Sequence, residues 1–306
     1  MRSIDPLPTA VPPDAELSRS AEKRPIRSVA ADLGFAPDDV EQFGTYAGKL
    51  THDAIQRSTN RCADGRLVLV TAMTPTPAGE GKTVTTIGLG GALEAIGERS
   101  LVAIREPSLG PIFGLKGGAT GGGYAQVVPM EDVNLQFTGD LPSITADHNL
   151  VAAMLDNHLH RGNELSIDVS EVVWPRALDV NDRALRRIVV GRGGEANGIT
   201  RESSFVITAA SELMAVVGMA EDLRDLERRV SRVIVAYDRH GEPVTVADLD
   251  ATGAVVTLLR DAIRPNHVQT LDGCPAFVHG GRSRTSPTVR IRSSPIESAS
   301  RFPTTS

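Results

Sequence analysis

The clearest hydrophobic patterning in the chain begins near residue 66. Residues 67–72 form a short continuous apolar run, which is typical of a strand buried on both faces of a sheet. After a loop rich in Pro and Gly, an amphipathic stretch at 82–96 predicts a helix that is closed by Gly97. A second apolar run at 101–104 predicts another strand. Strand, helix and strand within about 40 residues are typical of a βαβ unit, so we expect an α/β fold whose parallel sheet is flanked by helices.

The segment before this unit has a different pattern. Residues 1–16 combine four prolines with acidic residues and predict a disordered leader. Apolar positions between 18 and 33, and again from Asp38 through Leu50, predict two helical stretches, so we interpret 17–65 as a helical N-terminal segment. The main α/β domain should then occupy 66–281. Further expected helices lie at 143–160, 181–187, 211–220 and 222–230, and further strands at 187–190 and 232–237.

Composition narrows the class of protein. Of the 306 residues 41% are hydrophobic but only 4% aromatic, so the core depends on aliphatic side chains. A formal net charge of -6 argues against a nucleic-acid partner. Cys62 and Cys274 stand apart, without the spacing of a metal site. No apolar run approaches the ~18 residues of a membrane span, and no secretory signal is recognisable, so we expect a cytoplasmic protein without a membrane partner.

The loop between the first strand and its helix carries the first candidate chemistry. Backbone N–H groups at the start of a helix can converge on phosphate oxygens, so we predict a P-loop NTPase-like site here. Lys82 would reach the terminal phosphates, and the Thr83 hydroxyl would hold Mg²⁺. Thr76 replaces the first glycine of the usual Gly-x-x-x-x-Gly-Lys-Ser/Thr pattern, and an ordinary capped loop remains the alternative. The predicted nucleotide-binding residues are Thr76, Pro77, Ala78, Gly79, Glu80, Gly81, Lys82 and Thr83.

The second strand ends in a candidate anion-binding residue. Ligands of open parallel sheets bind beyond the carboxyl ends of the strands, so Arg105 should point toward the phosphates. A surface salt bridge is the alternative for this arginine. Six glycines follow within residues 114–123, and their apolar flanks favour a folded binding loop over a flexible linker.

Polar residues also interrupt several apolar runs. Each one alone is best explained by helix capping or by a satisfied core position, but as a set they suggest a polar wall beside the glycine loop. His158 and His160 are two residues apart and cannot share one face of a helix, which argues against a zinc pair. The residues in question include Asp132, Asn134, Asp140, His148, Asn149, Asp156, Asn157, His158 and Asn181–Arg183.

Several motifs together resemble the formate–tetrahydrofolate ligase family. The resemblance covers about residues 17–281, and its most specific parts are the threonine–proline form of the phosphate loop and the glycine segment. The motifs are Thr74–Thr83, Arg105–Pro111, Lys116–Gly118, Gly121–Val127, Pro129–Asp132, Asp156–His158, Gly162–Asn163, Asn181–Arg186 and Val268–Leu271.

The resemblance implies a reaction and roles for residues. Formate would attack the γ-phosphate of ATP to give formyl phosphate, and the N10 amine of tetrahydrofolate would then take the formyl group. By this resemblance Lys82 would contact the transferring phosphate, Arg105 would bind formyl phosphate, and Glu106 would help to position the reactants. A requirement for a monovalent cation and a homotetramer are expectations for intact members.

The chain departs from the family after Gly281. Family members continue Gly-Gly-Pro-Phe-Ala-Asn-Ile-Ala-His-Gly, whereas residues 282–306 are rich in Ser, Arg, Thr and Pro and predict an aberrant, disordered tail. GC-rich codons can be chosen for 283–292 that read Ala-Asn-Ile-Ala-His-Gly in a shifted phase. We therefore expect a frameshift near Gly281 that removes much of the folate pocket and impairs the ligase.

Two other functions are consistent with the phosphate loop. One is a P-loop ATPase of another class that drives a conformational change through a partner surface. The other is a non-catalytic nucleotide-binding remnant, which the expected truncation would favour. Formate dependence of ATP turnover separates both from a ligase.

Overall fold

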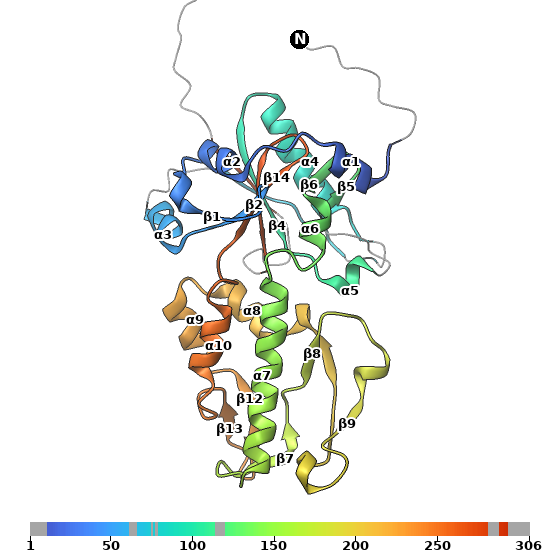
Figure 1. Ribbon diagram of the computed structural model, residues 1–306, viewed down its shortest axis with the longest axis vertical. Coiled ribbons are helices and arrows are strands. Elements are labelled where there is room, and N and C mark those ends of the chain that lie inside the picture. Colours follow the sequence, from blue (N-terminus) through green and yellow to red (C-terminus); the bar gives the residue numbers. More distant parts are fainter. Residues whose placement is uncertain are drawn as a thin grey trace, which may run out of the picture.

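Two lobes, connected by two adjacent segments of chain, form the computed structural model (Figure 1). It describes residues 11–60, 66–74, 76, 79–113, 120–280 and 288–292. The first lobe, here called the sheet lobe, contains the described chain up to Gly139 and again from Arg264 onward. The residues between them, beginning with helix α7, form the inserted lobe.

The main sheet of the sheet lobe is mixed and mostly antiparallel. Its order is β1-β2-β14-β15-β4-β16-β3, with β6 also paired to β14, and β5 to β6. Of its described pairs only β15 and β4 are parallel. The strands are β1 (Val40–Phe43), β2 (Ala47–Leu50), β3 (Arg66–Leu69), β4 (Arg99–Arg105), β5 (Gly121–Gly122), β6 (Ala125–Val128), β14 (Asn266–Thr270), β15 (Pro275–His279) and β16 (Thr288–Arg292).

The expected α/β class is confirmed. The sheet was expected to be parallel, but it is mixed and mostly antiparallel. Strands β3 and β4 run in the same direction on either side of helix α4 (Lys82–Ala95), as a βαβ unit requires. The place between them, however, is taken by β16, which is antiparallel to both. Two further neighbours, β1–β2 and β14–β15, are joined by short turns, and a short turn can join only antiparallel strands.

Strand β3 is an edge strand, and the prediction that it is buried on both faces is wrong. Leu67 and Leu69 are 64% and 57% exposed. An apolar run of this length shows that a strand is favourable but does not show how many neighbours it has. By contrast, β4 has alternating buried positions, including Val102 and Ile104 in the core beneath α4.

The N-terminal segment is only partly helical. Helices α1 (Asp14–Ser20) and α2 (Ile26–Asp32) cover the expected region, but Pro25 separates them because the residue before a proline is disfavoured in a helix. Helix α1 begins inside the expected leader, of which residues 1–10 lie outside the described chain. The helix expected from Asp38 to Leu50 is instead the β1–β2 hairpin, which turns at Gly44 with a φ of 71°. Helix α3 (His52–Asn60) follows it.

The inserted lobe surrounds the long helix α7 (Asp140–His160). Its other helices are α8 (Glu212–Met219), α9 (Leu223–Val230) and α10 (Thr252–Leu259), with 3₁₀ turns at Ala184–Arg186, Glu195–Asn197 and Thr208–Ala210. Its strands pair as β13 (Pro243–Thr245)–β12 (Ile234–Asp238)–β7 (Ile167–Val172), β11 (Phe205–Ile207)–β8 (Arg176–Leu178) and β10 (Arg201–Ser203)–β9 (Ile188–Val190). The sheet lobe also contains two short helices and a 3₁₀ turn, namely α5 (Leu109–Ile112), α6 (Met130–Asn134) and Pro37–Asp39.

The expected elements of this lobe are largely confirmed. Helices occur at 143–160, 211–220 and 222–230, with small shifts at their ends. The helix expected at 181–187 is only a 3₁₀ turn, Ala184–Arg186. The strands expected at 187–190 and 232–237 exist, but they belong to small sheets of this lobe and not to the main sheet.

Five residues of the tail that was expected to be disordered are described as a strand. Thr288–Arg292 pairs with both β3 and β4, while residues 281–287 and 293–306 lie outside the described chain. Strands β3 and β4 are separated by the width of one strand, so their facing edges carry unpaired backbone groups. Any extended segment can form hydrogen bonds with these groups, regardless of its side chains. Composition therefore does not exclude a strand here.

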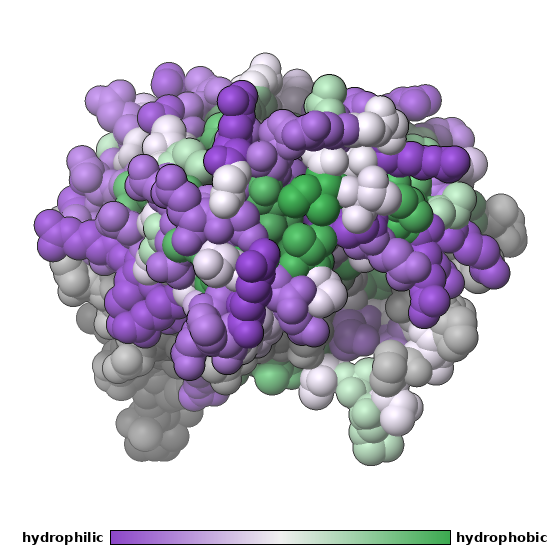
Figure 2. Space-filling model, turned by 90° about the horizontal axis from the view of Figure 1, so that it is seen from below, coloured by the Kyte–Doolittle hydropathy of each residue, from purple (hydrophilic) through white to green (hydrophobic). Residues whose placement is uncertain are grey.

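Seen from the end of the inserted lobe, most of the surface is hydrophilic, with apolar side chains gathered near the middle of the view (Figure 2). None of the described helices combines the length and the apolar character of a membrane span.

Close packing of α4 on β4 yields the first prediction. A Cβ atom at Gly90 would overlap the buried Cγ2 of Val102, whereas one at Gly88 would lie 3.8 Å from the Cβ of Ala125. We expect Gly90→Ala to lower the free energy of unfolding by about 1–3 kcal/mol, because the core cannot accept the added methyl group. Gly88→Ala, with the same gain in helix propensity, should be neutral or stabilising. Urea denaturation compares them, and equal effects would contradict the packing.

A buried carboxyl group in α7 yields a pH-dependent prediction. Asp147 is fully buried, its oxygens have no hydrogen-bond partner among the described residues, and burial raises its pKa from 3.8 to about 8. The folded protein thus keeps the proton up to about pH 8 while the unfolded chain releases it near pH 4, so this group destabilises the fold as pH rises between these values.

We therefore expect Asp147→Asn to gain stability relative to the wild type between pH 5 and pH 8, by at least about 1 kcal/mol. The free energy of unfolding at several pH values measures this gain. Asp53→Asn, at an exposed position of α3, is the control. A difference between Asp147→Asn and the wild type that does not vary with pH would exclude titration of Asp147.

Candidate functional site at the carboxyl edge of the sheet

The ends of three strands define one edge of the main sheet. Strands β3, β4 and β15 run in the same direction, so their carboxyl ends meet there. Leu69 and Ala103 both pair with Thr288, which shows that β3 and β4 are level with each other. The loop leading to Lys82 therefore leaves the sheet at the edge where Arg105 ends β4.

The phosphate loop has the backbone expected of an anion site in its described part. Gly79 and Gly81 have φ values of 89° and 67°, which favour glycine, and Gly81 is the N-cap of α4. Thr76 Oγ1 donates to the Gly79 carbonyl at 3.1 Å. No side chain among the described residues caps α4, so within this part of the chain the N–H groups of its first turn remain available to a ligand. Pro77 and Ala78 lie outside the described residues.

Lys82 and Thr83 are the first two residues of α4 and are half-buried. The Lys82 carbonyl accepts a hydrogen bond of 2.7 Å from Thr86 Oγ1, which anchors the first turn to the buried face of the helix. The positive end of a helix of 14 residues lies at this point, where an anion is stabilised. The fixed turn and the uncapped amides fit a phosphate group.

Arg105 is exposed at the end of β4 and reaches the inserted lobe. Its Nη2 donates to the carbonyl of Ala209 at 3.3 Å. Within the described part of the chain no carboxylate forms an ion pair with it, which disfavours the alternative of a surface salt bridge. Its guanidinium group is thus held at the junction of the two lobes.

Glu106, the next residue, is buried rather than exposed. Its N–H donates to the His279 carbonyl at 3.0 Å, which extends the pairing of β4 with β15. Its carboxyl oxygens make no hydrogen bond to the described residues. Burial, together with the neighbouring Asp140 carboxylate, raises the pKa of Glu106 well above its usual value, and Lys49 opposes this rise. The environment therefore favours the uncharged carboxylic acid, which can donate a hydrogen bond.

A buried ion pair next to Glu106 was not identified from the sequence. Lys49 Nζ lies 2.8 Å from the Asp140 carboxylate and donates to the Arg264 carbonyl at 3.0 Å. Asn266 Nδ2 also donates to Asp140, at 2.9 Å, and Thr138 Oγ1 donates to Asn266 at 2.5 Å. We call Lys49, Asp140, Asn266 and Thr138 the junction cluster, because it lies where both connecting segments cross between the lobes.

The loop after Arg105 packs against the inserted lobe. Ser108 Oγ donates to Asp179 at 2.6 Å, and the Leu109 N–H donates to the same carboxylate at 3.0 Å. A Cβ atom at Gly110 would lie only 2.9 Å from Asn181 Nδ2, so this glycine permits the close approach. The structure thus brings the Asn181–Arg183 motif next to the Arg105 loop. The glycine segment lies outside the described residues from 114 to 119, and Gly121–Gly122 form β5.

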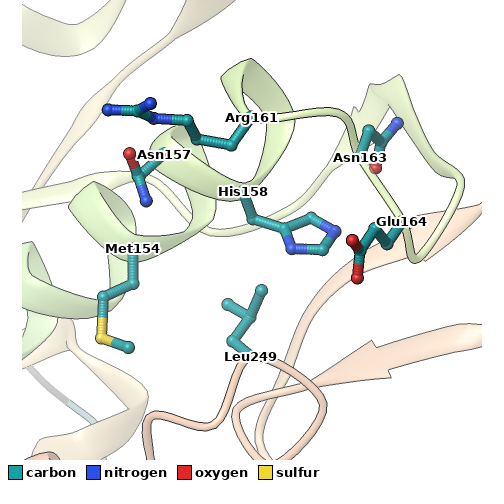
Figure 3. Close-up of a pocket in the computed structure, with 7 residues that line it drawn as sticks. All are labelled: Met154, Asn157, His158, Arg161, Asn163, Glu164 and Leu249. Atoms are coloured by element: carbon teal, nitrogen blue, oxygen red, sulfur yellow. The ribbon is translucent and has the colours of Figure 1, made fainter.

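The predicted polar wall is wrong for the residues at the far end of α7. Asp140 and His158 are 18 residues apart on one helix, which corresponds to about 27 Å. A separate pocket of about 250 Å³ lies at that end (Figure 3), and His158 Nε2 accepts a hydrogen bond from the Leu165 N–H there at 3.2 Å. It is lined by Met154, Asn157, His158, Arg161, Asn163, Glu164 and Leu249.

A metal site made only of acidic, His and Cys side chains is absent from the described residues, where no three such groups come together. The one cysteine that the structure describes, Cys274, is buried beside Ser100, and burial raises its pKa to about 12. It is therefore an unreactive core thiol, as expected from its isolation in the sequence.

These features define an α/β protein with a candidate anion site at one edge of its sheet. Comparison with known proteins identifies the family. A family model described as formate–tetrahydrofolate ligase matches residues 12–283, and the chain belongs to that family. It is 56% identical over 272 residues to a protein of Haloquadratum walsbyi and 58% identical over 259 residues to one of Haloarcula marismortui, each called formate–tetrahydrofolate ligase.

The alignments cover 88% and 84% of this chain but 47% of each relative. The chain thus spans about half the length of the curated relatives it matches. The resemblance identified from the motifs is confirmed, and the match ends two residues beyond Gly281.

The junction cluster yields the third prediction. We expect Lys49→Met to lower the free energy of unfolding by about 3–5 kcal/mol, because it leaves the Asp140 carboxylate buried without its cation. Lys49→Met combined with Asp140→Asn should lose less than the single change, since no unpaired charge remains. Urea denaturation of both variants and of Asp140→Asn completes the cycle. Additive losses would show that the two groups do not interact.

Proposed function

We propose that the sheet edge binds ATP and formate and that the chain takes part in the formation of 10-formyltetrahydrofolate. Family membership supports the reaction, and the arrangement at the edge supports its location. The observation that carries the proposal is the glycine-started α4 with Lys82 at its first position. It follows β3, which runs parallel to β4 and is level with it, so the loop before Lys82 and Arg105 leave the sheet at the same edge.

The proposed chemistry has two steps. An oxygen of formate bonds to the γ-phosphorus of ATP while the bond from that phosphorus to the bridging oxygen breaks, giving formyl phosphate and ADP. The N10 amine of tetrahydrofolate then bonds to the formyl carbon, loses a proton, and phosphate leaves. Phosphoryl transfer depends on positioning and on charge neutralisation more than on covalent assistance, which suits a site of backbone amides and two cations.

Each predicted residue has a role in this proposal. Lys82 and the amides of Gly79, Gly81 and the first turn of α4 hold the phosphates in a P-loop-type arrangement. Arg105 binds formyl phosphate through its planar guanidinium. Glu106, kept uncharged by burial, positions the reactants beside it. Thr83 would hold Mg²⁺, which when bound neutralises phosphate charge.

Further properties of the family remain proposals for this chain. A requirement for a monovalent cation is one of them and rests on the family resemblance. A homotetramer and a location in the cytoplasm are proposed on the resemblance alone.

One competing function has an observation in its favour. The matched region is 47% of each relative's length, so part of the family's binding surface lies outside the residues matched here, and a nucleotide-binding remnant is the alternative. We propose instead that this chain carries out the first step, because Lys82, Arg105 and Glu106 all lie within the matched residues 12–283.

The experiment measures formyl phosphate directly. Purified protein is incubated with MgATP and formate, and formyl phosphate is trapped with hydroxylamine as the hydroxamate. We expect product that requires formate, and a loss of at least about 100-fold in both Lys82→Ala and Arg105→Ala, because each removes a charge that stabilises the transferring phosphoryl group. Arg228→Ala, on exposed α9, is the matched control and should retain the wild-type rate.

The alternatives give other results. ATP binding without hydroxamate would show a remnant. ATP hydrolysis that ignores formate would show an ATPase of another class. Unchanged product in Lys82→Ala and Arg105→Ala would reject the assignment of these residues.

A further inference from the structure

A cluster of charge in the inserted lobe lies apart from the sheet edge. Asp156 is on the last turns of α7, Arg176 begins β8 and Arg201 begins β10. Asp156 forms ion pairs with both arginines, through Oδ2 to Arg176 Nη2 and through Oδ1 to Arg201 Nη1 at 2.6 Å. From the start of α7 at the sheet edge, Asp156 is 16 residues, or about 24 Å, along the helix.

The cluster carries one more positive charge than negative. Both guanidinium groups are always protonated, and no second carboxylate lies within ion-pair distance of them in the part of the chain that the structure describes. The Arg201 side chain is only 7% exposed, so bulk solvent does little to screen the excess charge.

The cluster also has unused hydrogen-bond donors. Arg176 Nη1, Arg201 Nε and Arg201 Nη2 are buried and have no hydrogen-bond partner among the described residues. Buried donors are rarely left without a partner, because each costs the free energy of its lost hydration. Water could accept these hydrogen bonds but could not balance the charge.

We propose that Arg176 and Arg201 bind a small monovalent anion, with chloride as the natural occupant. One negative charge balances the excess, and a spherical ion can accept from donors of both guanidinium groups at once. A phosphate would overcompensate the charge. The ion would join β8 and β10 to α7 and so fix the strands that lead into the segment carrying Asn181 and Ala209.

The first test locates the ion. Crystals of the wild-type protein grown in sodium bromide should show an anomalous bromide peak within hydrogen-bond distance of Arg176 Nη1 and the two free nitrogens of Arg201. A water molecule, a carboxylate of the chain or no density at this position would overturn the proposal, whatever peaks occur elsewhere on the surface.

The second test measures binding in solution. Melting temperatures are compared in sodium chloride and in sodium gluconate at equal ionic strength. We expect chloride to raise the wild-type melting temperature in a saturable manner, by at least about 2 °C. The difference should vanish in Arg201→Gln and persist in Arg228→Gln, whose arginine is an exposed residue of α9.

Equal melting temperatures in the two salts would reject the site, and so would a chloride effect that survives in Arg201→Gln. Arg201→Lys, which keeps the charge but offers fewer fixed donors, serves if the glutamine variant does not fold. It should need more chloride for half of the effect. Neither test depends on ligase activity, so the anion site and the proposed function fail independently.

Discussion

The arrangement of the candidate site depends on the buried ion pair between Lys49 and Asp140. Lys49 is fully buried on β2, and Asp140 is the first residue of the helix that begins the inserted lobe. The same lysine holds the carbonyl of Arg264, where the chain returns to the sheet. One ammonium group therefore fixes both crossings between the lobes. Removing two charges from water is costly, so the main effect of such a pair is to fix one arrangement rather than to add net stability.

This arrangement determines what faces the carboxyl edge of the sheet. Asp140 lies beside Glu106, and its charge helps to keep the Glu106 carboxyl protonated. The inserted lobe then places Ala209 against Arg105 and Asp179 against the loop that follows it. The groups at the edge come from segments 71 and 104 residues apart in sequence, and they meet only because the two crossings are held together. The position of Lys82 follows from the local structure of its loop and helix, whereas the surroundings of Arg105 depend on the tertiary structure.

The sequence predicted the local parts of this site well. Strand, glycine-containing loop and helix around Lys82 follow from neighbouring residues, and so does the end of β4 at Arg105. The pairing of the strands could not be predicted, because the hydrophobic pattern of a strand does not show which other strand it pairs with. The parallel sheet, the burial of Leu67 and the helix through Leu50 were wrong for this reason. Nothing in the sequence indicated that Lys49 is buried in an ion pair, because a lysine in the helical stretch expected there would be explained by exposure to solvent. The contact of Gly110 with Asn181 likewise depends on residues far apart in sequence.

The two steps of the family's reaction make different demands on a protein. Activation of formate needs a few cations and amides in fixed positions around small anions, and the candidate groups for this all lie between residues 79 and 106, from the loop before α4 to the residue after β4. Recognition of a folate needs a large surface for a planar ring system, and with 4% aromatic residues this chain offers few side chains for stacking. Anion chemistry can be held by a sheet edge and a helix end, whereas group transfer to a folate also needs a surface that binds the ring system. That difference is the physical reason to treat the two proposed steps of the reaction separately.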